Sequence, residues 1–181
     1  MQPTWMDHYD LNFWLWACLH DAEAYLESSR QLNSITTSYN ERLSTKRHLD
    51  LNQYHFAMTM GSLVKNLNRL APLFPSIQPV LNAAEHLKKE GLYLRNMIEH
   101  KEKNLEAANK GTPRGGFIRK LNLLSNLPGN RQGSSDATST IIDNDGHWLG
   151  GRLNVERVIA EVRPIYEVAQ AIPPPSSIPP H

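Results

Sequence analysis

Cysteine is nearly absent from the sequence, and this scarcity limits both the fold and the chemistry. Among 181 residues there is one cysteine, Cys18, within the apolar stretch LNFWLWACLH. One cysteine cannot form an internal disulfide, so the composition excludes a disulfide-rich secreted domain and is typical of a reducing, cytoplasmic compartment. Nothing near Cys18 in the sequence would lower the pKa of a thiol, and we therefore predict a small, buried apolar side chain.

Long apolar runs and a one-sided charge are also missing. The apolar stretch over residues 11–19 is too short to cross a bilayer, which takes about 20 residues. The opening MQPTWMDHYD has neither the basic region nor the cleavage pattern of a signal peptide. Nineteen basic and eighteen acidic residues give a formal net charge of +1, which neither requires nor excludes nucleic acid. We expect a cytoplasmic protein that does not contact a membrane.

The motifs of several large enzyme classes are absent too. The sequence has no glycine-rich phosphate loop followed by lysine and serine or threonine, and no paired-cysteine metal knuckle. Its histidines have no spacing that stands out as typical of metal ligands. We therefore expect no cofactor and no metal.

Hydrophobic periodicity predicts an all-α fold in one domain, residues 1–172, followed by a flexible proline-rich tail, residues 173–181. Apolar residues recur at helical spacing in four segments. The predicted helices span about 10–28, with a continuation toward residue 39 left open, then 49–70, 80–108 and 155–171.

The first predicted helix is apolar on nearly every side, because Phe13, Trp14 and Trp16 add to a stripe that already has helical spacing. Such a helix is usually buried on more than one side, and part of its surface is expected to meet a second chain. Asp7 or Asp10 is the predicted N-terminal cap. The polar stretch over residues 29–50 is interpreted as a frayed helix end or a connection.

The chain changes character after residue 110. Residues 111–139 are rich in glycine and proline and are interpreted as a loop with at most one helical turn. The run STIIDNDGHWLGGRL then predicts a β-hairpin around Asp145-Gly146, a favoured hairpin turn, before the last helix. The predicted fold is therefore a bundle of three to four main helices with one small inserted hairpin.

The stretch RNMIEH in the third predicted helix is the best candidate for chemistry. On a helical wheel with about 100° per residue, Arg95 lies at the border of the buried stripe, and Glu99 falls on the same side one turn later. Asn96 and His100 point further round, away from the core. These side chains are expected to face solvent or a partner, either as a solvated surface with an Arg95–Glu99 ion pair or as a functional site.

The surrounding sequence LYLRNMIEHKEKNL resembles the signature of the HEPN superfamily, the higher eukaryotes and prokaryotes nucleotide-binding domains. Members carry Arg, then four to six residues, then His, often with Asn, Asp or His directly after the Arg. They are small all-helical domains with this motif on a late helix. The resemblance implies a metal-independent endoribonuclease in a toxin–antitoxin, phage-defence or stress setting, with its site at the cleft of a homodimer.

The resemblance also implies roles for the motif residues. His100 would be the general acid/base, since an unperturbed imidazole has a pKa of about 6.5. Arg95 would stabilise the developing phosphorane charge through its planar fork of donors. Asn96 would position a phosphate oxygen or orient His100. Glu99 is not a required member and would tune His100 or simply pair with a neighbouring cation.

The basic stretch PRGGFIRK follows the motif helix and suggests a contact with RNA. Arg114, Arg119 and Lys120 would grip the RNA backbone, and Phe117 would stack on a base. The alternative is a solvated loop with one anchoring aromatic residue.

Three functions remain open at the level of sequence. The first is an HEPN-like ribonuclease whose partners are RNA, a second copy of the chain and an antitoxin. The second is an HEPN-like dimeric interaction module without nuclease activity, or the partner of a nucleotidyltransferase. The third is a helical protein with a purely structural role. The intact Arg-Asn-x-x-x-His pattern favours the first, whereas the near-neutral net charge favours the second.

Overall fold

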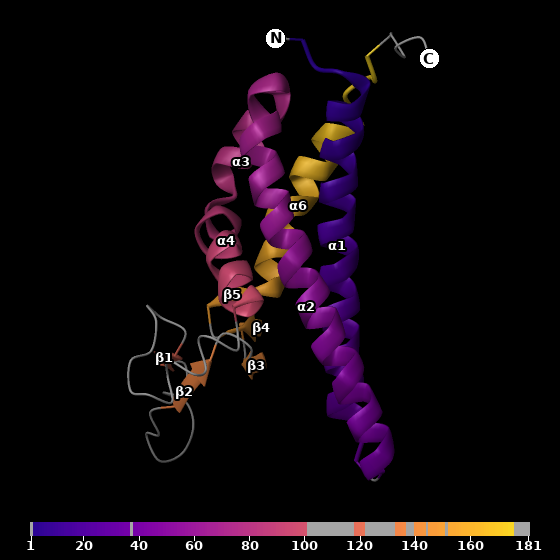
Figure 1. The fold of residues 1–181 in the computed structure, drawn as a ribbon, viewed down its shortest axis with the longest axis vertical. Coiled ribbons are helices and arrows are strands. Elements are labelled where there is room, and N and C mark those ends of the chain that lie inside the picture. Colours follow the sequence, from indigo (N-terminus) through magenta and orange to yellow (C-terminus); the bar gives the residue numbers. More distant parts are fainter. Residues whose placement is uncertain are drawn as a thin grey trace.

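The computed structural model describes residues 2–36, 38–100, 118–121, 133–136, 140–143, 145–150 and 152–175. Over these residues the protein is predominantly helical, which confirms the predicted fold class (Figure 1). An antiparallel hairpin precedes the last helix, also as predicted. Of the helices that the model describes, none combines the length and the apolar character needed to cross a membrane.

Helix α1, Trp5–Ser34, begins earlier than predicted because the cap is Thr4 rather than Asp7 or Asp10. The Thr4 hydroxyl accepts a hydrogen bond from the Asp7 N–H at 3.2 Å, and the Asp7 carboxylate accepts one from the Thr4 N–H at 2.9 Å. This reciprocal capping box satisfies two backbone donors that the first helical turn leaves open. Asp7 therefore supports the cap as the third residue of the helix and is not the cap itself.

Helix α2, Tyr39–Leu70, also starts ten residues before its predicted beginning. Ser38 caps it by accepting a hydrogen bond from the Glu41 N–H at 3.3 Å. The interpretation of residues 39–48 as a frayed end or connection was therefore wrong. Figure 1 shows the reason: the α1–α2 hairpin projects beyond α4, α6 and the strands, so its far end needs no apolar stripe. Leu51 and Tyr54, which resemble core positions in the sequence, are 50% and 48% exposed, whereas Leu49 and Phe56 in the same stretch are buried. Leu51 and Tyr54 therefore lie on the outer face of α2.

The third predicted helix is divided in two. After the short 3₁₀ turns η1, Ala71–Leu73, and η2, Pro75–Ile77, helix α3 covers Gln78–Ala83 and helix α4 covers Glu85–Glu99. The break at Ala84 is stabilised from elsewhere in the chain, because a carboxylate on the last helix caps α4. Residues 101–108, the remainder of the predicted helix, lie outside the described residues.

In the part of the chain that the structure describes, five short strands precede the last helix. Strands β1, Ile118–Leu121, and β2, Gly133–Asp136, pair antiparallel where the sequence predicted only a loop with at most one helical turn. Strands β3, Thr140–Asp143, β4, Gly146–Leu149, and β5, Leu153–Asn154, form a second sheet in that order. Asp143 pairs with Gly146, so the hairpin lies where it was predicted.

Helix α6, Val155–Gln170, packs lengthwise against α1 and carries much of the core (Figure 1). Asn154 caps it by accepting a hydrogen bond from the Arg157 N–H at 2.8 Å. Cys18 is buried in the same core, as predicted, and burial raises the pKa of its thiol. Large, fully buried side chains come from every main helix: Leu11, Leu15, Tyr25, Phe56, Leu63, Leu67, Leu94, Val158 and Ile165.

One face of α1 carries a line of exposed rings, which we call the ring row: Trp5, Tyr9, Phe13, Trp16 and His20. Most neighbouring rings stack along it, with centroids 5.5 Å apart for Trp5–Tyr9 and 5.2 Å apart for Trp16–His20, whereas the planes of Phe13 and Trp16 are tilted by 41°. Tyr9 and Trp16 are each 49% exposed. The apolar excess predicted for this helix is thus only partly used by the protein's own core.

Candidate functional site

Asn96 and His100 lie on one exposed side of α4, at its C-terminal end. The His100 N–H donates to the Asn96 carbonyl oxygen at 3.2 Å, so the backbone of His100 continues the helical pattern. At about 100° per residue the two side chains leave the helix about 40° apart. As the helical wheel predicted, they point away from the core, where a ligand can reach them.

Arg95 is placed differently from its two partners in the motif. It is half-buried, and its aliphatic stem crosses α2 at Gly61. A Cβ atom at position 61 would lie 2.6 Å from Cβ and 2.8 Å from Cγ of Arg95, closer than such atoms approach in proteins. The prediction that the motif faces away from the protein's own helices is therefore wrong for the stem of Arg95. The absence of a side chain at Gly61 makes this close packing possible.

Tyr93, on the same stretch of α4, forms a cation–π pair with Arg152 of the β4–β5 turn. The guanidinium carbon of Arg152 lies 4.1 Å from the centre of the Tyr93 ring. Its Nε donates to Oε2 of Glu90 at 2.8 Å, and Glu90 is 7% exposed. The turn that presents Arg152 is closed by its N–H, which donates to the Leu149 carbonyl at 3.2 Å, and it includes Gly150 with a φ of 61°. The β4–β5 turn is thereby docked on α4.

The N-terminal end of α4 is held by α6 and β5. Glu161 accepts hydrogen bonds from the N–H groups of His86 at 3.2 Å and Leu87 at 2.8 Å. Nε2 of His86 accepts a hydrogen bond from the Asn154 N–H at 2.9 Å, which requires that this nitrogen be unprotonated. Burial and the nearby Arg157 guanidinium lower the pKa of His86. His86 is therefore a neutral residue that joins α4 to the start of α6.

A second histidine is paired with a carboxylate beside the hairpin. Nδ1 of His147 donates to Oε1 of Glu156 at 2.6 Å, and the His147 backbone N–H donates to Oε2 at 2.9 Å. Burial alone would raise the pKa of Glu156, but the hydrogen bonds from His147 outweigh it and the pKa is lowered. Gly146 permits this contact, because a Cβ there would lie 2.6 Å from Oε2 of Glu156. The His147 side chain is only 12% exposed, whereas the Glu156 side chain is 39% exposed, so the carboxylate rather than the imidazole is the accessible half of the pair.

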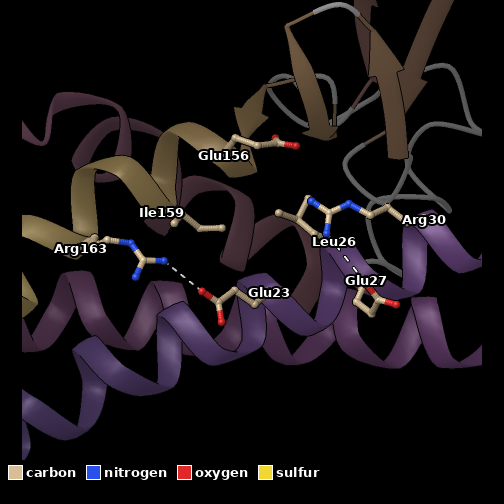
Figure 2. A pocket seen from close by; sticks show the side chains of 7 residues that line it. All are labelled: Glu23, Leu26, Glu27, Arg30, Glu156, Ile159 and Arg163. Atoms are coloured by element: carbon tan, nitrogen blue, oxygen red, sulfur yellow. Dashed lines mark hydrogen bonds and ion pairs between the residues drawn. The ribbon is translucent and has the colours of Figure 1, made fainter.

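A cavity of about 480 Å³ lies between α1 and α6 (Figure 2). Its two arginines each face a glutamate of α1, with Arg163 and Glu23 3.0 Å apart and Arg30 and Glu27 3.9 Å apart. These pairs largely neutralise the charge of the lining, and no residue of α4 contributes to it. The lining residues are Glu23, Leu26, Glu27, Arg30, Glu156, Ile159 and Arg163.

The predicted RNA-binding residues are only partly described. Arg119 and Lys120 belong to β1, which pairs with β2. Arg114, Phe117 and the side chain of Glu99 lie outside the described residues. Their contact with RNA stays a prediction. Within the part of the chain that the structure describes, no group of three or more histidine, cysteine, aspartate or glutamate side chains is placed to hold a metal ion.

Comparisons of the chain with protein-family models, with curated proteins and with solved structures found no match.

Sequence reasoning missed Tyr93, Arg152 and Glu90. One signal was present: His86, Tyr93 and His100 are seven residues apart, so they lie along one line of α4. Nothing local in the sequence connects residue 152 with residue 90, because their contact depends on how the β4–β5 turn docks.

Proposed function

We propose that the protein is a metal-independent endoribonuclease of the HEPN type, with His100 and Asn96 as its central residues. The observation that supports this proposal is that both side chains are exposed together at the end of α4. Both side chains are exposed, in contrast to His86 at the other end of the same helix, whose ring accepts a hydrogen bond from the Asn154 N–H. An accessible imidazole beside an accessible amide suits proton transfer at a phosphodiester.

The proposed reaction uses the RNA's own 2′-hydroxyl as the nucleophile. The 2′-oxygen attacks the adjacent phosphorus, the bond from phosphorus to O5′ breaks, and the products are a 2′,3′-cyclic phosphate and a 5′-hydroxyl. His100 accepts the proton from the 2′-hydroxyl as a general base. A protonated imidazole, supplied by His100 of a second copy, gives a proton to O5′. Asn96 donates a hydrogen bond to a phosphate oxygen and orients the reacting groups.

The proposed enzyme is a homodimer in which two copies bring their α4 ends together. A site on one exposed helix end excludes little water, and a second copy would turn it into a cleft. Arg95 in this proposal stabilises the phosphorane charge, while its stem keeps α4 close to α2. An antitoxin that covers this end of α4 is a further proposed partner.

The test is RNA cleavage in excess EDTA by the wild-type protein, His100→Ala and Asn96→Ala. We expect wild-type cleavage to yield 2′,3′-cyclic phosphate ends, because the 2′-oxygen is the nucleophile. Loss of the general acid/base in His100→Ala should reduce the rate about 10²–10⁴-fold. Asn96→Ala should reduce it less. An RNA with 2′-O-methyl groups should resist cleavage altogether.

The matched control is His48→Ala, which removes another exposed histidine, from α2. It should cut RNA at the wild-type rate. Equal cleavage by His100→Ala and wild type at the same purity would mean that the activity is a contaminant, and the proposal would be abandoned. Absence of cleavage by every variant on mixed tRNA and mRNA would favour the second candidate.

The second candidate is a non-catalytic dimeric interaction module or a nucleotidyltransferase partner, and the ring row of α1 supports it. Exposed aromatic side chains in a continuous row are more typical of an interface than of a free surface. This candidate predicts that Tyr9→Glu lowers the mass of the protein in solution, measured by sedimentation equilibrium. Tyr54→Glu is the matched control, because Tyr54 and Tyr9 are 48% and 49% exposed. An equal mass for both variants and the wild type would remove this support.

A further inference from the structure

We propose that Arg152 binds a backbone phosphate of the RNA beside the cleavage position, and that Tyr93 and Glu90 hold its guanidinium ready for that contact. This inference rests on the proposed function, and it names a binding residue outside the RNMIEH stretch. It also gives the β4–β5 turn a task in substrate binding.

Arg152 lies on the same side of α4 as His100, because it contacts Tyr93, which shares that side of the helix. Tyr93 precedes His100 by seven residues, so their side chains leave the helix only about 20° apart. At about 1.5 Å per residue, they are separated by about 10 Å along the axis. Along the helix axis, Asn96 lies between them. The guanidinium over the Tyr93 ring therefore lies on the same side of α4 as Asn96 and His100, within reach of one extended RNA strand.

The guanidinium is held in place before any ligand arrives. The Tyr93 ring supports one of its faces at 4.1 Å, and the buried Glu90 carboxylate accepts its Nε–H at 2.8 Å. Arg152 itself is 22% exposed at its side chain. A side chain that is already ordered loses little conformational entropy on binding, which favours affinity.

Donors remain for a phosphate. Arginine carries five N–H groups, and only the one on Nε is used by Glu90. Among the hydrogen bonds formed by the described residues, none involves the two Nη atoms of Arg152. These atoms carry the four remaining N–H groups in the planar fork that suits phosphate oxygens. The Glu90 carboxylate thus orients the guanidinium without using its phosphate-binding capacity.

Arg95 does not duplicate this arrangement. On the helical wheel it leaves α4 about 140° from His100, and its stem is packed against Gly61 of α2. Arg152 belongs to the β4–β5 turn rather than to α4, and its guanidinium lies over Tyr93, on the His100 side of the helix. The two arginines therefore act at different places, and their variants should have different effects.

The experiment measures binding and cleavage separately. The binding probe is a fluorescein-labelled, mixed-sequence 20-nucleotide RNA with 2′-O-methyl groups, which cannot be cut through a 2′-hydroxyl. Its Kd is measured by fluorescence anisotropy at several salt concentrations for wild type, Arg152→Met and Arg163→Met. Arg163→Met is the matched control, because it removes the same charge and one ion pair, at 3.0 Å to Glu23 of α1. Cleavage of the matching unmodified RNA gives kcat and KM.

We expect Arg152→Met to raise Kd and KM about tenfold, since it removes a charge-assisted contact, and to leave kcat within about threefold. The slope of log Kd against log salt should fall by about 0.7, the value for one phosphate contact with a single strand. Arg163→Met should change none of these quantities. A purely structural Arg152 would leave the salt slope unchanged.

The outcomes separate the two proposals. If the wild type binds the probe and Arg152→Met alters neither its Kd nor the salt slope, the inference is overturned whether or not RNA is cut. If Arg152→Met weakens binding and lowers the salt slope but no variant cleaves RNA, the contact of Arg152 with an RNA phosphate stands, and the nuclease proposal fails together with its cleavage position. Failure of the wild type to bind the probe overturns the inference as well.

Arg152→Lys covers the possibility that the methionine variant does not fold. A lysine keeps the positive charge beside Glu90 but lacks the second donor group of the fork. It should fold, as checked by circular dichroism, and should still weaken binding about threefold or more. Wild-type affinity in Arg152→Lys together with a wild-type salt slope would again count against the inference.

Discussion

The two ends of helix α4 use the same kinds of side chain for opposite purposes. At the N-terminal end, Glu161 of α6 accepts hydrogen bonds from the backbone of α4, and His86 of α4 accepts one from the backbone of β5. At the C-terminal end, Asn96 and His100 are exposed. The difference teaches that a histidine is a candidate for chemistry only after the backbone groups around it have been accounted for. His86 is explained by the fold, and His100 is not.

The largest effect on stability is expected when the supported end loses its cap. Glu161→Ala would leave the N–H groups of His86 and Leu87 without their carboxylate, which typically costs about 0.5–2 kcal/mol. Urea unfolding followed by far-UV circular dichroism measures the change. Glu167→Ala, an exposed residue of the same helix, is the control and should stay close to wild type. Equal midpoints for the two variants would show that α4 does not depend on α6 for its start.

A somewhat smaller loss is expected in the middle of the helix, where α4 crosses α2. Gly61→Ala places a methyl group against the stem of Arg95, and such overpacking costs about 1–3 kcal/mol. The better helix propensity of alanine offsets about 1 kcal/mol of this cost. The net effect should be a destabilisation on the order of 1 kcal/mol, measured by the same urea unfolding.

The control for this substitution is Gly91→Ala. Its new methyl group would meet Cγ2 of Val64 at 3.1 Å, a less severe contact. Adding Arg95→Ala to Gly61→Ala should recover part of the loss, because it removes Cγ and Cδ from the contact. A double variant less stable than the sum of the two single variants would contradict the close packing of Arg95 on Gly61.

The pH dependence of stability should distinguish the two histidines. The folded state holds His86 with a pKa below its ordinary value of 6.5, so the unfolded chain binds a proton more readily. The contribution of His86 is therefore complete above pH 6.5 and is lost as the pH falls below it. Thermal unfolding between pH 7 and pH 5 should show a smaller decline in Tm for His86→Gln than for wild type.

Glu156 does not interfere in that window. Its folded pKa is below the ordinary value of 4.5, so its contribution is lost only at more acidic pH. His100→Gln is the control and should reproduce the wild-type decline between pH 7 and pH 5. The same decline in His86→Gln as in wild type would mean that His86 is not held neutral in the folded protein.

The smallest effect on stability is expected at the exposed end. His100→Ala removes an exposed side chain, and the free energy of unfolding should stay within about 0.5 kcal/mol of wild type. Calorimetry beside His86→Ala, which should be clearly less stable, measures this. A loss in His100→Ala as large as that in His86→Ala would remove the contrast between the two ends.

Much of the fold could be predicted from local sequence patterns. The helical class, the hairpin before α6 and the burial of Cys18 all follow from periodicity and turn residues that act over a few positions. The start of α2 could not be found this way, because its first turns project beyond the bundle and carry no apolar stripe. The break at Ala84 was missed because it depends on Glu161, more than seventy residues later in the chain.

The candidate site divides in the same manner. The exposure of Asn96 and His100 follows from the geometry of a single helix, so the sequence could predict it. The packing of Arg95 depends on a glycine of α2, and the contact of Arg152 with Tyr93 depends on a turn between two strands. Neither contact has a local signal. Sequence patterns therefore placed the residues of one helix and missed the partners that other elements bring to it.

The cap that Glu161 provides for α4 has a consequence for the order in which the protein matures. During synthesis α1 and α2 emerge first and can pair as soon as both are complete. The start of α4 waits for residue 161, and the guanidinium beside Tyr93 waits for residue 152. A nascent chain therefore carries the histidine of its candidate site long before the surroundings of that site exist. Any activity that depends on the finished end of α4 should begin only after residues 152 and 161 have left the ribosome.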